Sequence, residues 1–398
     1  MIILAIILTI AVGTTAFLGL LWLDHNRETR LPTPTGPFAT GRIAYDWIDA
    51  EDTDPLAPQP GTHREILVWI WYPAQAQPHQ PAGDYLPAPW RTAVEQRRGG
   101  LITNLLTRNL SRVRAHSLPE PSVAPEQRSY PMVLMRAGLA ALTAEYTSLA
   151  EDLASHGYVV VGFDAPYRSA VVVSDKRGVI LRTAENDADL VGGSELQRVS
   201  NRLVQGWTAD MRFALNRLEW LNASDPSGRF VGRLDLQRAG VFGHSLGGAV
   251  ALQFCHEDAR CKACIDIDGA PVGSVIHDGV EKPSMFLLSD HRSESASPES
   301  QQIEANIRSI QDRAPAGAKW KVTIRGATHF MFSDDGSMLK SPLVLRLMRF
   351  FGVLHIDGRR QVAVTAQCVR AFFDVYLKGA PASKLEALAQ VPEIQLSK

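Results

Sequence analysis

The chain has 398 residues, of which 45% are hydrophobic and 21% are charged, and its formal net charge at pH 7 is −1. A chain of this length can bury a large core, and the composition is that of a globular protein rather than a disordered one. Because the charge is balanced, no basic field points to a nucleic-acid partner.

The N-terminus is a long apolar stretch. Residues 1–23 carry no charged side chain and are long enough to span a bilayer as a helix. No Lys or Arg precedes the run, and residues 12–16 offer only a weak cleavage site for a secretory signal. We therefore predict an uncleaved membrane anchor, with cleavage and secretion as the alternative. Residues 24–40 are expected to form a linker, and residues 41–398 a single globular domain.

Strand and helix patterns alternate along that domain. The final helix, 362–377, has an apolar stripe suited to docking on a sheet. The expected strands are residues 64–73, 130–135, 158–164, 239–242, 263–268, 284–289 and 320–325, with a further helix at 143–156. This alternation predicts an α/β fold with a mostly parallel central sheet and helices on both faces.

Two insertions interrupt the alternation. In the first, at about 83–125, leucines recur at helical spacing between Leu101 and Val113 among several arginines. This pattern predicts a basic amphipathic helix, which either packs on the sheet or lies on an anionic membrane surface. The second, at about 169–206, predicts a β-hairpin over 171–181 followed by a short helix near 195–203, placed to wall a pocket.

A G-x-S-x-G motif, Gly243-His244-Ser245-Leu246-Gly247, lies between a short apolar strand and a helical run. Strand, sharp turn and helix are the context of a nucleophile elbow. The glycines let two backbone segments approach closely at a strained turn, which lifts the Ser245 hydroxyl above the sheet. The Leu246 N–H then lies at a helix N-terminus, where it can bind an oxyanion.

The four cysteines bear on the cellular compartment. Cys255 should end the helix that follows Ser245, and Cys261 should begin the next strand, so a corner can bring them together. Cys264 lies too far along the same strand to pair with Cys261. We predict a Cys255–Cys261 disulfide, which implies an oxidising compartment outside the cytoplasm, although Arg27 and Arg30 after the anchor weakly favour a cytoplasmic body.

A nucleophilic serine needs a base, and the base needs a group that orients it. In α/β-hydrolases the chain order is Ser, acid, His. His329 follows the last predicted strand on a loop at its carboxyl end, whereas His244 is held by the turn and is expected to be a packing residue. The other histidines after Ser245 that we considered are His256, His277, His291 and His355, of which His355 is the main rival.

The residues alone leave two aspartates as candidates for the acid that orients the histidine. Asp268 ends the strand after the nucleophile helix, and Asp290 ends the next strand. Asp266 points the same way as Asp268 but lies one pleat deeper. A carboxylate in an apolar strand needs a partner, and His329 would supply one to Asp268.

The chain resembles the platelet-activating-factor acetylhydrolase, isoform II type, of serine-dependent lipases. The likeness runs from about residue 64 to 379 and is carried by several stretches in order. They are 65–73, Asp152-Leu-Ala-Ser-His-Gly157, the elbow Gly243-His-Ser-Leu-Gly-Gly248, Asp266-Ile-Asp268 and Thr323-Ile-Arg-Gly-Ala-Thr-His329.

The resemblance implies an α/β-hydrolase fold and, for the acid, Asp268. It also places Gly138-Leu139 in the oxyanion loop, so that the Leu139 N–H would join that of Leu246. The family's His-Gly-Leu-Gly loop reads Ala137-Gly138-Leu139-Ala140 here, a change that keeps the backbone donor.

The implied activity is hydrolysis of short or oxidised acyl chains on glycerophospholipids without metal, calcium or another cofactor. Taken together, the sequence predicts a membrane-anchored serine ester hydrolase with Ser245, Asp268 and His329 as its catalytic residues. One alternative is a dienelactone-hydrolase-like or cutinase-like esterase acting on small or polymeric esters. Another is a catalytically silent, membrane-anchored binding protein.

Overall fold

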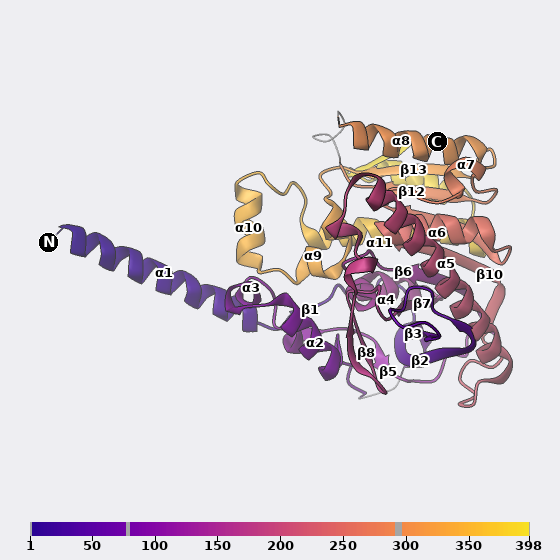
Figure 1. The fold of residues 1–398 in the computed structure, drawn as a ribbon, viewed down its shortest axis with the longest axis horizontal. Helices are drawn as coiled ribbons and strands as arrows, with labels where there is room; N and C mark the ends of the chain where they lie inside the picture. Colours follow the sequence, from indigo (N-terminus) through magenta and orange to yellow (C-terminus); the bar gives the residue numbers. More distant parts are fainter. Residues whose placement is uncertain (1, 77–79, 291–296, 398) are drawn as a thin grey trace.

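In the computed structural model, which describes residues 2–76, 80–290 and 297–397, a ten-stranded sheet forms the centre of the body (Figure 1). The strand order is β14-β13-β12-β11-β10-β6-β7-β3-β2-β5. Strands β6, β7, β10, β11, β12 and β13 run parallel to one another. Strand β3 is antiparallel to both β7 and β2, β14 is antiparallel to β13, and β2 pairs in parallel with the short β5. The strands of this sheet are β2 (Ala39–Thr53), β3 (His63–Ala74), β5 (Leu118–Pro119), β6 (Tyr130–Arg136), β7 (Val159–Asp164), β10 (Leu234–His244), β11 (Cys261–Ile267), β12 (Ser284–Leu288), β13 (Lys319–Ile324) and β14 (Ile394–Ser397).

Helices cover both faces of the sheet, and each face has its own apolar core. Strands β6 and β7 are buried along their whole length, as expected of central parallel strands. Helices α4 (Thr147–Ser155) and α11 (Gly358–Lys378) pack on one face, and α5 (Gly193–Ser224), α6 (Leu246–Glu257) and α8 (Pro298–Arg313) pack on the other. The shorter elements are β1 (Thr29–Arg30), β4 (Val113–Arg114), β8 (Val171–Ser174), β9 (Gly178–Leu181), α2 (Ala88–Arg98), α3 (Leu101–Leu105), α7 (Val275–Asp278), α9 (Asp334–Met338), α10 (Pro342–Phe350) and α12 (Ser383–Glu386).

This arrangement confirms the predicted α/β class, and six of the seven predicted strands lie within two residues of their observed bounds. The exception is the strand expected at 239–242, since β10 begins five residues earlier, at Leu234, and ends at His244. The β8–β9 hairpin also forms. The helix expected near 195–203 is longer than predicted, because it continues along the sheet to Ser224 and buries an apolar stripe there. Strand β2 was not predicted, since much of its length is only partly buried and charged residues such as Asp46 interrupt its pattern.

The predicted basic amphipathic helix over 101–113 is wrong. The chain there forms α3, then a 3₁₀ turn at Leu110–Arg112, and then β4, which pairs with β1. The break has a physical cause. The backbone N–H of Arg108 donates to Leu339 (2.7 Å), and that of Asn109 donates to His25 (3.0 Å), so this backbone bonds to distant segments instead of to its own preceding turn.

The stretch expected to be a linker, 24–40, lies against the body. Thr35 donates to Asp152 through its N–H (3.0 Å) and its hydroxyl (2.7 Å). Gly36 packs so closely on Ser155 that a β-carbon there would lie 2.1 Å from the Ser155 carbonyl oxygen. The chain between the apolar helix and β2 is therefore held in place by hydrogen bonds and close packing.

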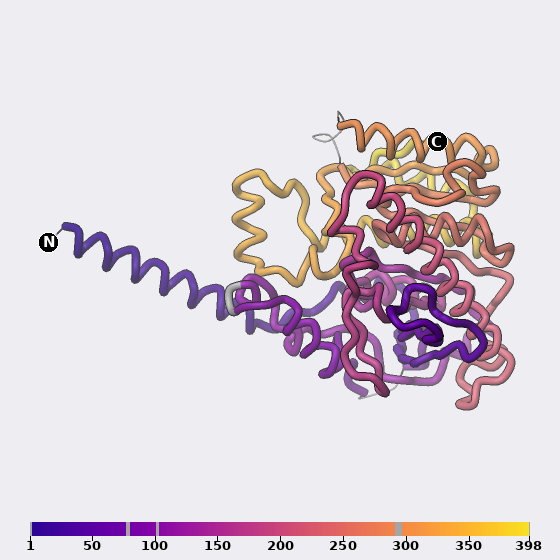
Figure 2. Tube along the Cα trace, in the orientation of Figure 1, coloured from indigo at the N-terminus to yellow at the C-terminus, as the bar shows by residue number. Residues whose placement is uncertain are grey.

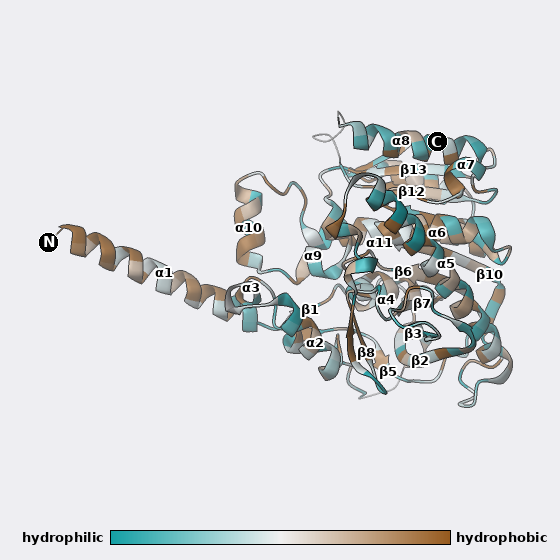
Figure 3. Ribbon diagram, viewed as in Figure 1, coloured by the Kyte–Doolittle hydropathy of each residue, from teal (hydrophilic) through white to brown (hydrophobic). Residues whose placement is uncertain are grey.

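Helix α1 (Ile2–Asn26) projects away from this body, as the trace in Figure 2 shows. Almost all of it is exposed and apolar (Figure 3), and it is long and apolar enough to cross a membrane. Its last turn is fixed to the body: His25 Nδ1 lies 2.7 Å from the Thr107 carbonyl oxygen, and Asp24 accepts from the Ser341 hydroxyl (2.5 Å). The direction in which α1 leaves the body is set by these contacts.

The structure contains the predicted disulfide between Cys255, at the end of α6, and Cys261, at the start of β11. The remaining two cysteines, Cys264 and Cys368, are buried thiols. Burial raises the pKa of each of these thiols to about 12, so both remain neutral and unreactive at physiological pH.

Candidate active site

The turn between β10 and α6 has the strained geometry of a nucleophile elbow. Ser245 has φ 57° and ψ −128°, which places a non-glycine residue at positive φ. The flanking glycines are required by contact distance: a β-carbon on Gly243 would lie 1.9 Å from the Gly247 oxygen, and one on Gly247 would lie 2.3 Å from the Arg136 oxygen. The Ser245 N–H donates to the Ile267 oxygen on β11 (2.8 Å), which ties the turn to the neighbouring strand.

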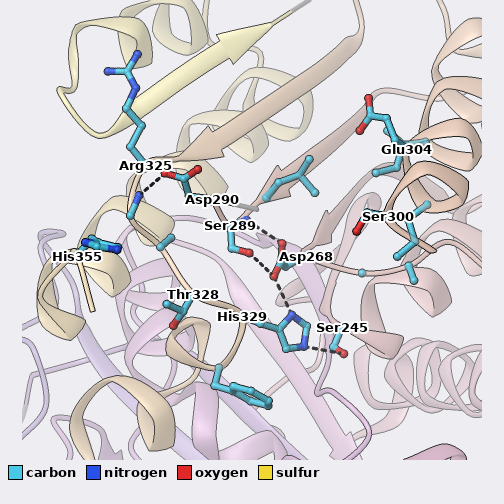
Figure 4. Close-up of a pocket in the computed structure, with 18 of the residues that line it drawn as sticks. Ser245, Asp268, Ser289, Asp290, Ser300, Glu304, Arg325, Thr328, His329 and His355 are labelled. Atoms are coloured by element: carbon cyan, nitrogen blue, oxygen red, sulfur yellow. Dashed lines mark hydrogen bonds and ion pairs between the residues drawn. The ribbon is translucent and has the colours of Figure 1, made fainter. Parts of the chain in front are cut away.

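Three side chains from distant parts of the sequence meet above the carboxyl ends of the strands (Figure 4). His329 Nε2 lies 3.1 Å from Ser245 Oγ, and His329 Nδ1 lies 2.8 Å from Asp268 Oδ2. An ionised carboxylate only accepts hydrogen bonds, so Nδ1 carries the proton and the Nε2 lone pair faces the serine hydroxyl. This is the tautomer in which an imidazole can remove a proton from serine.

Asp268 is held by more than the histidine. Its side chain is 1% exposed, and it accepts from the Ser289 N–H (2.7 Å) and the Ser289 hydroxyl (2.8 Å). These donors fix the carboxylate and stabilise its charge in a buried place. Sequence reasoning did not single out Ser289; its position at the end of β12, beside Asp290, was the available signal.

The rival residues lie elsewhere. Asp290 accepts from the Gly326 N–H (2.9 Å). His355 lines the same pocket and packs on Gly326, without a hydrogen bond to Ser245. His256 lies on α6, 3.7 Å from Asp278, His277 lies on α7, and His291 falls outside the described residues.

Asp266 lies directly beneath this set, one pleat deeper, as expected. It is fully buried, and its Oδ1 accepts from the Gly269 N–H (2.7 Å). Burial raises the pKa of Asp266 to about 8, so the side chain is a neutral acid at pH 7. It packs on Gly248, where a β-carbon would lie 2.0 Å from Asp266 Oδ1, and thereby joins the nucleophile helix to the turn that carries Asp268.

His244, expected to be a packing residue, packs directly on His329. The two ring centroids are 4.6 Å apart. His244 Nδ1 forms a 2.7 Å hydrogen bond with the Tyr146 hydroxyl, and burial lowers the pKa of His244 to about 3. A neutral ring of fixed orientation therefore supports one face of the His329 imidazole. Sequence reasoning missed Tyr146, because nothing in the pattern near it points to the site.

The loop after β6, which contains Gly138 and Leu139, also lies against Ser245. A β-carbon on Gly138 would lie 3.2 Å from Ser245 Cβ, so this loop runs against the serine. Within the described chain, neither the Leu139 N–H nor the Leu246 N–H donates to a protein acceptor. Arg182 donates to the Leu139 carbonyl oxygen (2.9 Å) and pairs with Asp187 (2.8 Å), which fixes the loop from the hairpin side.

A cavity of about 1500 Å³ opens beside Ser245, Asp268 and His329. Among the described residues, one wall is formed by apolar side chains of α8, including Ile303 and Ile307. The rim carries Phe330 and Val353, which are 75% and 57% exposed. The cavity is therefore large, partly apolar and bordered by exposed apolar side chains.

The fold and this geometry define the class: an α/β-hydrolase with a serine, a histidine and an aspartate hydrogen-bonded in series at the carboxyl edge of the sheet. The sequence profile of the platelet-activating factor acetylhydrolase, isoform II, family matches residues 23–380. The chain belongs to this family.

Individual relatives are consistent with that membership. The platelet-activating factor acetylhydrolase of Canis lupus familiaris is 23% identical over 346 residues, which cover 77% of this chain and 69% of that protein. A probable 1-alkyl-2-acetylglycerophosphocholine esterase of Arthroderma benhamiae is 24% identical, over 65% of this chain and 64% of its own length.

Among solved structures, a ferulic acid esterase from Streptomyces cinnamoneus superposes with a TM-score of 0.73 and 28% identity. The match covers 93% of this chain and 99% of the esterase chain. Family and neighbour together show that the chain is an ester hydrolase, as the sequence predicted.

Proposed function

We propose that the chain hydrolyses short or oxidised acyl esters, on glycerophospholipids or similar molecules, through an acyl-enzyme on Ser245. The observation that carries this proposal is the pair of hydrogen bonds by which His329 bridges Ser245 and Asp268. The family supports the same chemistry, because its curated members are named as acetylhydrolases of an acetylated phospholipid.

The proposed reaction follows from the positions of the groups. His329 Nε2 takes the Ser245 proton while Oγ attacks the ester carbonyl. The N–H groups of Leu139 and Leu246 stabilise the tetrahedral oxyanion, each contributing about 3 kcal/mol to the lowering of the barrier. Asp268 stabilises the imidazolium, which then protonates the leaving alcohol. Water activated by the same imidazole releases the acyl group from Ser245.

A fluorophosphonate probe tests the nucleophile. Native chain should be labelled covalently, and Ser245→Ala should lose both the label and ester turnover. Asp175→Asn, at the exposed hairpin turn, is a matched control that should keep both. Labelling that persists in Ser245→Ala would contradict the assignment.

A second substrate class has its own support. The cavity beside Ser245 is larger than an acetyl group requires, and the solved neighbour is named as a ferulic acid esterase. Aromatic or polymeric esters are therefore the alternative. A panel of short-acyl phospholipids, nitrophenyl esters of increasing chain length and feruloyl esters separates the two, since the preferred class should have a kcat/KM at least tenfold above the other.

We also propose that α1 anchors the chain in a membrane, with the body outside the cytoplasm. The apolar length of α1 and the disulfide support this placement. Four exposed apolar residues support it further, and we call them the α10 patch; they lie in the second half of α10 and just after it, and the start of α10 contacts Asp24 at the base of α1. They are Leu347, Phe350, Phe351 and Val353.

Because Val353 also lines the cavity, the α10 patch would present the catalytic opening to the lipid surface. Carbonate extraction of membranes and N-terminal sequencing of the mature chain test the anchor. Release into the soluble fraction with loss of residues 1–23 would support secretion instead.

A further inference from the structure

A second, smaller cavity lies at the base of α1, separate from the cavity that Ser245, Asp268 and His329 line. Its volume is about 220 Å³, and it is enclosed by the chain after α1, by α10 and by the start of α11. Its walls combine basic and apolar side chains. The basic ones are Arg108, Arg346, Arg349 and Arg359, and the apolar ones include Met338, Leu345 and Leu354.

Positive charge dominates the lining. Four arginines face this cavity, and Asp357 is the acidic residue among the described lining residues. Asp357 is already engaged, because it pairs with Arg349 (2.8 Å) and accepts from the Arg359 N–H at the start of α11. Within the described chain, Arg346 makes no ion pair or side-chain hydrogen bond.

Arg108 is the buried member of the group, with 7% of its surface exposed. It bonds to Asp24 through Nη1 (3.3 Å), and its Nε has no partner within the described chain. Burial lowers the pKa of Arg108, and the neighbouring cations Arg27, Arg359 and Arg346 lower it further against the effect of Asp24. Cations gathered around a partly dry cavity are stabilised by an anion placed between them.

The position of the cavity relative to the predicted membrane span indicates which anion it binds. Asp24 directly follows the last apolar residue of the predicted span, and Thr29, on the cavity wall, is five residues further on. Phospholipid head groups occupy roughly the first 5–8 Å outside the hydrocarbon core. Helix α10, much of which is apolar (Figure 3), begins beside Asp24, and the exposed aromatic residues of the α10 patch are of the kind that suits the membrane interface.

We propose that this cavity binds the phosphate group of an anionic membrane phospholipid. The inference rests on the proposed membrane attachment. Guanidinium groups of Arg346 and Arg359 donate to the phosphate oxygens, Arg108 supplies charge from the inner wall, and Leu345 and Leu354 contact the apolar part of the lipid. The site fixes the rotation of the body about α1, and so holds the catalytic opening at the membrane surface.

The experiment compares thermal unfolding of the full chain, purified in neutral detergent, with three additives: phosphatidylglycerol, phosphatidylcholine and inorganic phosphate. Phosphatidylglycerol at saturating concentration should raise Tm by about 3 °C. Arg346→Gln combined with Arg359→Gln should lose that shift. Without lipid it should melt close to the native temperature, because both side chains are exposed and the one hydrogen bond lost within the described chain is the exposed bond from Arg359 to the Arg30 carbonyl oxygen (2.5 Å). Arg128→Gln combined with Arg198→Gln removes the same charge from distant exposed positions and should keep the shift.

Each outcome decides the proposal. An equal phosphatidylglycerol shift in the Arg346/Arg359 variant would overturn the site. Equal shifts with phosphatidylcholine would overturn the requirement for an anionic lipid, and equal shifts with inorganic phosphate would overturn the lipid as its source. Because the measurement is made in detergent, it reports on lipid binding at this cavity even if membrane extraction shows that α1 is not an anchor.

Discussion

The carboxyl edge of the sheet, where Ser245, Asp268 and His329 meet, and the base of α1 differ in how their residues are held. At that edge, Ser245 and Asp268 directly follow β10 and β11, and His329 lies in a turn after β13. The three side chains are joined by hydrogen bonds, and Asp268 is also held by the buried Ser289 N–H. At the base of α1, the α10 patch and most of the arginines around the small cavity are exposed. One region is complete within the protein, whereas the other has the exposed apolar and cationic groups of a surface that meets a partner. Substitutions can test that contrast.

The largest effect is expected at Asp268, which we propose as the catalytic acid. Asp268→Asn should lower kcat by about 10⁴-fold, because an amide cannot hold His329 in the required tautomer. Asp290→Asn, whose side chain bonds to the Gly326 N–H instead, should stay within about tenfold of native. Ester turnover of the two purified variants is the measurement. A greater loss in Asp290→Asn would show that the wrong aspartate is assigned.

A smaller loss is expected at Arg182, which bonds to the proposed oxyanion loop. Arg182→Gln removes a charged hydrogen bond to the Leu139 carbonyl oxygen, and such a bond contributes about 1.5–3 kcal/mol. We expect kcat to fall by about 10- to 100-fold with KM little changed, and Arg182→Lys to recover part of it. Steady-state kinetics on a soluble ester provide the readout. A rise in KM at constant kcat would indicate a role in binding rather than in positioning.

At the base of α1 the expected effect depends on the substrate's surroundings. Phe350→Ser combined with Phe351→Ser should reduce turnover of an ester embedded in vesicles by about fivefold, since apolar contact with the lipid is lost. Turnover of a water-soluble ester should not change, because these side chains are 83% and 73% exposed and are not among the described residues that line the cavity beside Ser245. Leu190→Ser, at another exposed apolar position, is the matched control. Equal losses on both substrates would place the two aromatic residues in the fold rather than at a membrane.

The smallest effect concerns stability at the catalytic edge. The pKa of Asp266 is raised to about 8 by burial, so the folded chain keeps a proton that the unfolded chain releases near pH 4. The stability that this proton provides is present below about pH 4 and is lost as the pH rises through 8. The side chain of Asp266→Asn does not titrate. Between pH 6 and 8 the free energy of unfolding of this variant should therefore decrease less steeply than that of the native chain, with a difference in slope of up to about 1 kcal/mol per pH unit.

Thermal unfolding at pH 6, 7 and 8 checks this difference, with Asp175→Asn as the exposed control. The control should follow the native pH dependence, and Asp266→Asn should depart from it while keeping most of its activity. Parallel curves for all three proteins would show that Asp266 is ionised in the folded chain.

The sequence by itself determined the sheet, the elbow and the membrane-length helix. Buried parallel strands are continuous apolar runs, the elbow needs glycine where two backbones touch, and a membrane span needs about 20 apolar residues, so all three leave local patterns. His329 could be proposed because chain order and strand ends restrict where a base can lie. Asp268 could not be separated from Asp290 by the residues alone, since both follow neighbouring strands.

Tertiary structure decided the remaining features, because they depend on contacts between distant segments. The support that Ser289 gives to Asp268, and that Tyr146 and His244 give to His329, arises from side chains brought together only by folding. The stretch 101–113 has the periodicity of one helix, yet the helix ends at Leu105, and the backbone after it bonds to His25 and Leu339. Local periodicity reports which side chains are apolar, and long-range hydrogen bonds decide whether the backbone between them can remain helical.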